Sequence, residues 1–213
     1  IPRDRKRYWV DNFIVLYNPL AGNGTAQDKM RELESLMQGD RLYFSNMLDI
    51  RDYGAFFNDM PDGASIIICG GDGTLNRFLN DTEDIRPDCD IYYYPSGSGN
   101  DFARDIDAER GASPVLINRY IERLPKICVN GKEHRFINGI GYGIDGYCCE
   151  KGDELRGKGN GEVNYTAIAI KGLLFHYKPT GATITVDGVE HRFEKVWLAP
   201  TMNGRFYGGG MMV

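Results

Sequence analysis

The strongest constraint on the fold is a unit that occurs three times in the first half of the chain. Each unit is an apolar run, a glycine-rich turn and a helix-like segment. The turns read YNPLAGNGT, CGGDGTLN and PSGSGNDFA, at residues 17–25, 69–76 and 95–103. Apolar strands that alternate with helices indicate a parallel sheet with right-handed crossovers. All three turns would then lie at the carboxyl ends of the strands, where open α/β folds bind their ligands.

The elements of this α/β half follow from apolar periodicity. Its first helix is expected to begin at Thr25, where Thr25 and Asp28 fit a capping box, and to end by Gly39. The same apolar patterns predict the other strands and helices of this half. We expect strands over 12–18, 41–48, 65–69 and 90–95, and helices over 52–59, over 74–80 and from Asn100.

The second half of the chain has a different pattern. Residues 113–125 read as a helix, with Ser113 as its cap and Pro114 in its first turn. Asn130–Gly131 and Asp187–Gly188 are typical turns of β-hairpins, and a helix over 162–175 is expected between them. We therefore predict two domains, residues 1–112 and 113–213.

Composition excludes several classes of protein. The net charge of -5 and the pI of about 5.3 argue against nucleic acid as the main partner. The five cysteines form no CxxC pair, so neither a disulfide framework nor a zinc site is expected. No apolar run approaches the ~20 residues of a membrane span. A cytoplasmic protein with reduced cysteines and without a transmembrane segment is predicted.

The three glycine-rich turns are suited to a polyphosphate. Glycine lets backbone N–H groups approach an anion closely, and each helix that follows carries about +0.5 of a charge at its N-terminus. Two common nucleotide motifs are absent from the sequence. It contains no GxxxxGK[ST] of a P-loop NTPase, and no GxGxxG follows its first strand, so a dinucleotide-binding oxidoreductase is poorly supported.

Asp72, in the middle turn, is the unexpected residue for a phosphate site. About 4 Å from a phosphate charge, its carboxylate would cost on the order of 4 kcal/mol per unit charge at an effective ε near 20. A hydrated Mg²⁺ between Asp72 and the phosphates would remove this cost, and so would a position facing a hydroxyl nucleophile. Both arrangements indicate phosphoryl transfer. In a third interpretation, Asp72 only caps the helix that begins at Thr74.

The three glycine-rich turns together resemble the motifs of one enzyme family. NPLAG at 18–22, GGDGTLN at 70–76 and PSGSGNDFA at 95–103 resemble the diacylglycerol kinase catalytic family, which includes bacterial lipid kinases and sphingosine kinases. The resemblance continues weakly through 136–146 and 203–211. GGDGT is shared with NAD kinases, whereas its combination with the third turn is more specific to lipid kinases.

The resemblance implies a fold and a place for the active site. The fold would be an α/β, parallel-sheet nucleotide-binding domain like those of NAD kinases and diacylglycerol kinases, followed by a mostly-β sandwich domain. The active site would lie in the cleft between the two domains. Relatives continue beyond the GGGM stretch and carry there an acidic residue in a DGE-like motif, thought to take the substrate's proton. We therefore expect this chain to be part of a longer protein, with a β domain incomplete at its C-terminus.

The resemblance also implies roles for individual residues. Asp72 would be catalytic, and Asn100 and Asp101 would shape the substrate side near the transferred phosphate, unless they merely cap the next helix. The remaining residues would bind ATP, and they are Asn18, Pro19, Leu20, Ala21, Gly22, Gly71, Asp72, Gly73, Thr74, Asn76 and Ser98.

Some positions depart from the family pattern or stay open. Ser98 stands where relatives often have Thr, and the hydroxyl is kept. Arg77 stands where relatives often have an acidic residue, so its role is open. A further family Thr after the second strand could correspond to Ser45, Asn46 or Met47. The metal ligands are not assigned.

The function expected from the resemblance is that of a lipid kinase. It would use ATP and Mg²⁺ to phosphorylate a lipid hydroxyl, with diacylglycerol as the first candidate, and would touch the membrane peripherally to collect its substrate. Exposed sheet edges of an incomplete β domain would invite association, so a homodimer is one expected form. The alternatives are an NAD kinase and a non-catalytic nucleotide sensor.

Overall fold

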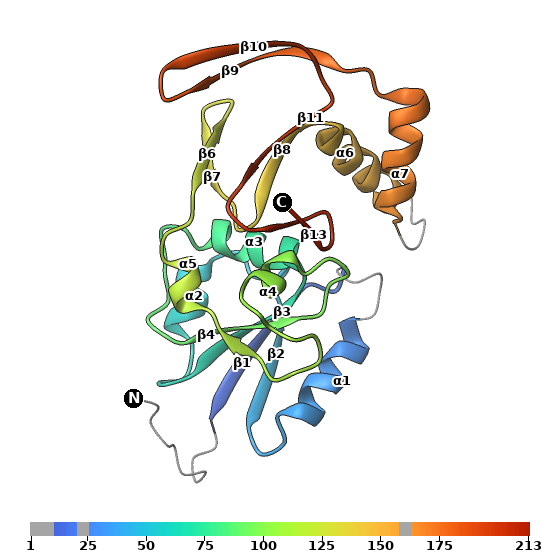
Figure 1. The fold of residues 1–213 in the computed structure, drawn as a ribbon. Helices are drawn as coiled ribbons and strands as arrows, with labels where there is room; N and C mark the ends of the chain where they lie inside the picture. The colour runs from blue at the N-terminus through green and yellow to red at the C-terminus, as the bar shows by residue number, and fades with distance from the viewer. Residues whose placement is uncertain (1–10, 21–25, 158–162) are drawn as a thin grey trace. The chain divides into compact units, whose positions relative to one another are not determined.

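The structure is a computed structural model that describes residues 11–20, 26–157 and 163–213, and it divides into two compact units (Figure 1). The first unit contains the chain up to Asn138 together with Gly204–Val213, and the second contains Gly139–Asn203. Compact units need not coincide with the domains of a complete protein. The domain limits expected from the sequence, near residue 112, therefore stay a prediction.

A five-stranded sheet forms the centre of the first unit, in the order β2-β1-β3-β4-β5. The first four strands are parallel, and β5 pairs antiparallel with β4 at one edge. The strands are β1 (Asn12–Tyr17), β2 (Arg41–Asn46), β3 (Ser65–Gly70), β4 (Ile91–Pro95) and β5 (Val115–Leu116). The helices between them are α1 (Ala26–Leu36), α2 (Tyr53–Asn58), α3 (Asp72–Asp81), α4 (Asp101–Asp105) and α5 (Asn118–Ile121).

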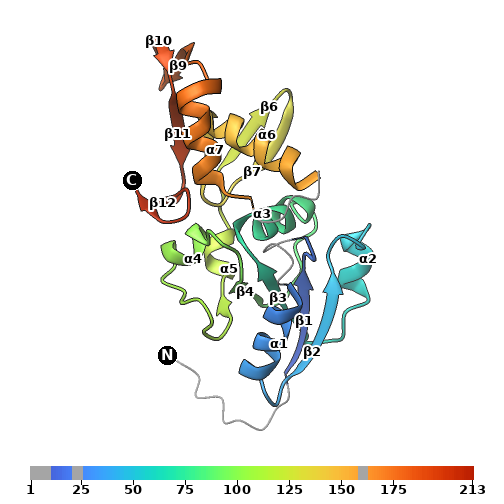
Figure 2. The same ribbon diagram turned by 90° about the vertical axis from the view of Figure 1, so that its right-hand side faces the viewer.

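Helices cover both faces of this sheet (Figure 2). Alternate residues of β1 and β3 point to opposite faces, so each strand contributes to two cores. On one face, Val15 and Ile67 pack with Leu33 of α1. On the other, Leu16 and Ile68 belong to a larger cluster that also contains residues of α2, α3, α4 and α5. The strands are apolar throughout because both of their faces are buried.

The expected alternation of strands and helices in the first half is confirmed, as is the α/β fold class with a β-rich C-terminal part. Thr25 of the expected capping box lies outside the described residues.

The helix expected over 113–125 is wrong. Val115 and Leu116 instead form β5, which pairs with Tyr93 and Tyr92 of β4, and only Asn118–Ile121 is helical. Ser113 and Pro114 are compatible with a helix start, but the pairing of Val115 and Leu116 with β4 overrides this local signal. The backbone groups of Val115 and Leu116 are satisfied by the sheet edge.

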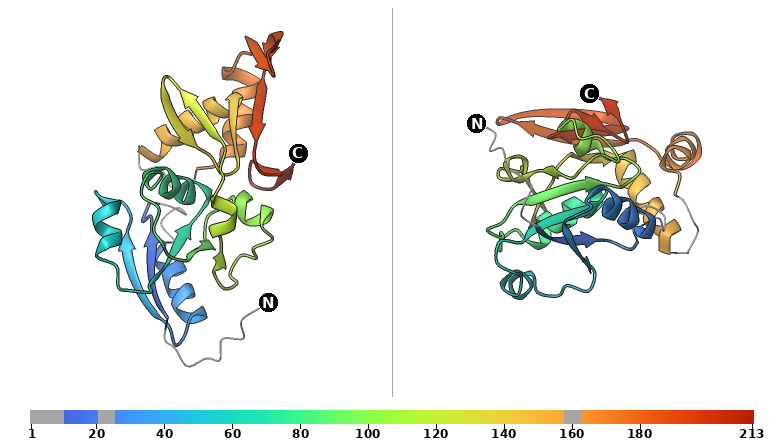
Figure 3. Two further views of the ribbon diagram at one scale, coloured as in Figure 1. Left: turned by 90° about the vertical axis from the view of Figure 1, so that its left-hand side faces the viewer. Right: turned by 90° about the horizontal axis from the view of Figure 1, so that it is seen from below.

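Two hairpins have the turns that their sequences predict. Asn130–Gly131 joins β6 (Lys126–Val129) to β7 (Lys132–Arg135), which form a ribbon of their own (Figure 3). Asp187–Gly188 joins β9 (Thr180–Val186) to β10 (Val189–Val196). All four turn residues have positive φ, as type I′ turns require.

The second unit also contains a strand pair and two helices. Strands β8 (Gly139–Gly143) and β11 (Leu198–Met202) are antiparallel, and helix α6 (Ile144–Gly157), which the sequence pattern did not predict, packs against α7 (Tyr165–Lys171). A π-helical turn, Gly172–His176, follows α7 directly. The start of the expected helix 162–175 and most of the loop 156–161 lie outside the described residues.

The chain then returns to the first unit. There it forms the short strands β12 (Phe206–Tyr207) and β13 (Met211–Met212). Within the described ranges, every helix is too short or too polar to cross a bilayer.

Candidate active site

Four loops leave the central sheet at the same edge, because the ends of the parallel strands are in register. Tyr17 at the end of β1 pairs with Asn46 of β2 and with Cys69 of β3, while Gly70 pairs with Pro95 of β4. The loops that begin at residues 18, 47, 71 and 96 therefore start side by side. This is the shared edge that the three glycine-rich turns predict.

The second and third glycine-rich turns touch through their backbones. A Cβ on Gly97 would lie 2.5 Å from the Gly71 Cα, and one on Gly71 would lie 3.0 Å from the Gly97 Cα. A Cβ on Gly70 would overlap the Thr74 side chain. These three glycines are thus required by packing, independently of any ligand.

Asp72 connects the same two turns by hydrogen bonds. It is the first residue of α3, and its Oδ2 accepts from the Asp101 N–H at 3.0 Å while its Oδ1 accepts from the Phe102 N–H at 3.0 Å. Asp72 therefore caps a helix, as one interpretation of the sequence proposed, but the helix is α4 and not its own. Each carboxylate oxygen accepts one of these bonds and keeps a further lone pair for another partner.

Asn100 occupies the N-cap position of α4, but its side chain shapes the third turn and makes no capping hydrogen bond. Its backbone is left-handed, with φ of 56°. Its Oδ1 accepts from the Gly97 N–H at 3.0 Å, and its Nδ2 donates to the Gly97 carbonyl at 2.7 Å. The buried amide closes the turn around Gly97 and holds it in the position where it meets Gly71.

Asp101 connects the third turn to the returning segment 204–213. The residue is only 6% exposed, and its Oδ2 accepts from the Gly209 N–H at 2.8 Å. Its Oδ1 accepts from Arg104, which also donates to the Gly99 carbonyl. Both carboxylate oxygens of Asp101 therefore accept hydrogen bonds from other groups of the protein.

A second anchor holds the same segment one turn further along α4. Asp105 Oδ1 accepts from the Arg205 backbone N–H at 2.9 Å and from its Nε at 3.2 Å. The sequence reasoning did not single out Arg104, Asp105 or Arg205, and their roles depend on contacts about a hundred residues apart. Only the weak resemblance of 203–211 to the family indicated this region.

The first turn is described in part. Asn18 Oδ1 accepts from the Leu20 N–H at 3.0 Å, which forms a tight turn around Pro19. Ala21 and Gly22 lie outside the described residues. The structure thus places Asn18, Pro19 and Leu20 at the common edge of the sheet.

The other predicted nucleotide-binding residues differ in exposure. Gly73 and Ser98 are exposed, Asn76 is half-buried and Thr74 is buried. A Cβ on Gly73 would meet no described atom within 4 Å, in contrast to Gly70, Gly71 and Gly97. Backbone at Gly73 is therefore open to a ligand.

Arg77 lies on the exposed side of α3, one turn beyond these residues. Its Nε forms an ion pair with Asp81 at 3.3 Å. Exposed pairs of this kind contribute little to stability. The structure gives Arg77 a local partner on its own helix, Asp81.

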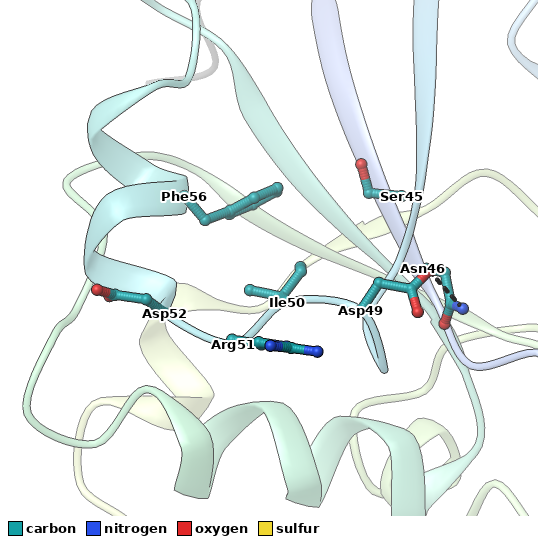
Figure 4. A pocket seen from close by; sticks show the side chains of 7 residues that line it. All are labelled: Ser45, Asn46, Asp49, Ile50, Arg51, Asp52 and Phe56. Atoms are coloured by element: carbon teal, nitrogen blue, oxygen red, sulfur yellow. Dashed lines mark hydrogen bonds between the residues drawn. The ribbon is translucent and has the colours of Figure 1, made fainter.

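A shallow, open pocket of about 450 Å³ lies beside the end of β2 (Figure 4). Of the three candidate positions after the second strand, Ser45 and Asn46 line this cavity, whereas Met47 is buried in the core. The Asn46 amide is used locally, since its Oδ1 accepts from the Leu48 N–H and its Nδ2 donates to Asp49. The remaining lining residues are Asp49, Ile50, Arg51, Asp52 and Phe56.

The groups beneath the turns are buried and neutral. Burial raises the pKa of Tyr93 well above its usual value, and the negative charge of Asp72 raises it further. Burial likewise raises the pKa of the Cys69 thiol. Neither side chain offers a ready nucleophile at neutral pH, because the thiolate and the phenolate are both disfavoured.

A dedicated metal centre is not found in the described parts of the chain, where no three His, Cys, Asp or Glu side chains are grouped to hold an ion. Mg²⁺ in kinases is usually held by one or two carboxylates and by the phosphates of the substrate. The lone pairs that remain on Asp72 fit such a shared site.

Comparison with known families decides the family of this chain. Residues 12–126 match the model of the diacylglycerol kinase catalytic domain, which covers the sheet, its helices and all three glycine-rich turns. The chain belongs to the diacylglycerol kinase catalytic domain family. This is a family of lipid kinases, as the sequence motifs predict.

Individual relatives are distant. The chain is 26% identical over 164 residues to YtlR of Bacillus subtilis (strain 168), named provisionally as a lipid kinase, and this match spans 68% of the chain but only about half of YtlR, 52%. It is 25% identical to a diacylglycerol kinase of Mycobacterium tuberculosis (strain CDC 1551 / Oshkosh), over 98% of the chain and 70% of that protein.

Solved structures agree with the fold. A diacylglycerol kinase structure from Bacillus anthracis str. Sterne superposes with a TM-score of 0.54 at 23% identity, covering 96% of this chain and 68% of that one. At this identity, the likeness supports the fold alone. It bears out an α/β half followed by a β-rich part.

Proposed function

We propose that this chain is the nucleotide-binding part of an ATP- and Mg²⁺-dependent lipid kinase that phosphorylates the hydroxyl of diacylglycerol. The observation that carries the proposal is the joining of two glycine-rich turns by Asp72, within a chain of the diacylglycerol kinase catalytic domain family. The name of the mycobacterial relative supports diacylglycerol as the acceptor.

The phosphates of ATP would lie at the exposed backbone of Gly73, at the N-terminus of α3. This helix has ten residues, so its first turn presents N–H groups and a positive dipole end to an anion. The exposed hydroxyl of Ser98 would donate a further hydrogen bond from the third turn. Asn18, Pro19 and Leu20 would close the site from the first turn.

The adenosine would occupy the cavity beside β2. Its volume is large enough for a nucleoside, and it combines an aromatic ring, Phe56, with the polar groups of Ser45 and Arg51. Among the three positions after the second strand, Ser45 is our choice for the family's hydroxyl, because Met47 is buried and the Asn46 side chain is already bonded.

Asp72 would have two roles in phosphoryl transfer. It aligns the third turn through its two hydrogen bonds, and its remaining lone pairs would hold a hydrated Mg²⁺ that neutralises charge on the transferred phosphate. Asn100 and Asp101 would act by positioning. Asn100 fixes the turn around Gly97, and Asp101 fixes the segment at Gly209.

The proposal is tested by incubating the natural full-length protein with radiolabelled ATP, Mg²⁺ and one of four acceptors: diacylglycerol, sphingosine, phosphatidylglycerol or NAD. Label in phosphatidic acid is expected. Label in NAD alone would overturn the proposal in favour of an NAD kinase. ATP binding with no label in any acceptor would overturn it in favour of a nucleotide sensor.

A further inference from the structure

Residues 170–178 of the second unit expose an unusual amount of apolar side chain. The exposed fractions are 53% for Ile170, 47% for Leu173, 67% for Leu174 and 76% for Phe175. Three of these residues follow one another in the π-helical turn after α7 (Figure 1). Single exposed apolar residues are common, whereas a group of this kind marks an interaction site.

The opposite side of the same turn is well packed. Gly172 is buried, and a Cβ there would lie 2.7 Å from Cε1 of Tyr147 in α6. The ring of Tyr177 lies 6.2 Å from that of Tyr147 and 5.9 Å from that of Trp197, measured between centroids. The turn is thus anchored through Gly172 and Tyr177, and it directs Leu173–Phe175 away from its own core.

The chain leaves α7 through a turn that is wider than a turn of an α-helix. The Tyr177 N–H donates to the Gly172 carbonyl at 2.8 Å, an i to i+5 bond. Turns with this bond are frequent at functional sites when they interrupt an α-helix, and they also occur at helix C-termini, as here. Here its effect is to expose three consecutive bulky apolar residues.

The charge around this turn is positive in a chain that is acidic. The protein has 30 Asp and Glu against 25 Lys and Arg, yet no Asp or Glu occurs from Val163 to Val186. Lys171 and Lys178 flank the apolar residues, and both are exposed. Apolar residues bordered by lysines are typical of segments that lie in the interface of a bilayer with anionic lipids.

We propose that Leu173–Phe175, flanked by Lys171 and Lys178, inserts into the surface of an anionic lipid bilayer. The apolar side chains would reach the acyl boundary, and the lysine ammonium groups would stay at the level of the lipid phosphates. A second copy of the chain fits less well, because a two-fold contact would set the lysines of this turn against their own counterparts. The inference rests on the proposed function in one respect, since a lipid substrate makes contact with a bilayer necessary.

Vesicle co-sedimentation of the natural full-length protein tests this surface without requiring activity. Vesicles of phosphatidylcholine with phosphatidylserine are compared with vesicles of phosphatidylcholine alone. A variant with Leu173→Ser, Leu174→Ser and Phe175→Ser should bind the anionic vesicles at least about tenfold more weakly. Lys171→Gln with Lys178→Gln should lose about tenfold on anionic vesicles and leave neutral ones unchanged.

A matched control is available in the same unit. Val186 and Val189 are also more than half exposed, but they flank the Asp187–Gly188 turn and precede Glu190. Val186→Ser with Val189→Ser should leave vesicle binding unchanged. All variants lie in exposed positions, and circular dichroism is the measurement that checks their folding.

Two outcomes would overturn the proposal. Equal vesicle binding by the wild type and the triple serine variant would place the membrane contact elsewhere. A dimeric wild type that becomes monomeric in the triple variant, with no change in vesicle binding, would identify the turn as a contact between copies. The proposed kinase activity is read separately with a short-chain diacylglycerol in solution, which the triple variant should phosphorylate as the wild type does.

Discussion

Asp72 has a structural role that is compatible with the chemical role proposed for it. Two backbone N–H groups of α4 bond to its two oxygens, so the turn that would hold the nucleotide and the turn next to it are aligned by a single side chain. The sequence suggested a cap as an alternative to a functional role. The geometry makes capping and a functional role compatible, because the lone pairs that remain on Asp72 can bind a metal ion or accept a hydrogen bond from a hydroxyl.

Asp72→Asn should lower both stability and activity. An asparagine side chain offers one acceptor oxygen, and its NH₂ group would face the second backbone N–H. That N–H would have no acceptor, which costs about 1–3 kcal/mol of unfolding free energy. Turnover should fall ~10²–10³-fold, as for the loss of one preorganised electrostatic group. Denaturant titration and the radiolabel assay measure the two effects. Turnover within a few-fold of wild type would remove Asp72 from the mechanism.

Tyr93 contributes to the response of stability to alkaline pH in the same region. Burial and the charge of Asp72 raise its pKa well above the usual value near 10. Above pH ~10 the unfolded state therefore releases the Tyr93 proton while the folded state keeps it. The unfolding free energy is unaffected by this group below pH ~10 and declines as the pH rises further. The hydroxyl also finds no hydrogen-bond partner among the described residues.

Tyr93→Phe should accordingly raise the unfolding free energy by about 1 kcal/mol at neutral pH and reduce its decline above pH ~10. Denaturant midpoints measured at several pH values give both quantities. Tyr43, which is 49% exposed, provides the control, and Tyr43→Phe should change neither. A Tyr93→Phe protein less stable than wild type would show that the hydroxyl is bonded.

At the scale of the elements, hydrogen bonds to helix α4 hold the returning segment 204–213 in place. Asp101 bonds to the Gly209 N–H, and Asp105 bonds to Arg205. Asp101→Ala or Asp105→Ala should therefore raise the hydrogen-exchange rates of amides in 205–213 at least about tenfold, because a lost charged hydrogen bond contributes about 1.5–3 kcal/mol. Asp84→Ala, an exposed change on another loop, is the control. Unchanged exchange in both aspartate variants would mean that other contacts hold the segment.

The elements also show what can be predicted from sequence. Strands β1, β3 and β4 and helix α3 were predictable because their apolar runs and flanking glycines are local signals. Residues 113–125 were not, because the pairing of Val115 with Tyr93 joins segments distant in the chain. The partners of Asp72 and Asp101 depend on tertiary contacts in the same way. The glycine-rich turns pointed to the candidate site, and the hydrogen bonds between them could be seen only in the structure.

For the whole molecule, the two units carry different properties. The first contains the sheet edge with its glycine-rich turns, and the second contains the exposed apolar turn with its two lysines. The two proposals, a nucleotide site in the first unit and a membrane contact in the second, together describe an enzyme that would take ATP from solution and its acceptor from a membrane surface. The nucleotide site is the part of this account on which the rest depends.

Titration of Mg·ATP by calorimetry into wild type and Gly73→Ala tests that site most directly. Gly71 is less suitable, because its Cβ would meet the Gly97 backbone at 3.0 Å, whereas a Cβ on Gly73 meets no described atom. Gly146, which is also an unhindered helical glycine, provides the control as Gly146→Ala. Gly73→Ala should weaken ATP binding at least about tenfold, with unfolding free energy unchanged or raised by up to about 1 kcal/mol. Gly146→Ala should bind as the wild type does. Unchanged ATP affinity in Gly73→Ala would contradict the placement of the phosphates at this edge of the sheet.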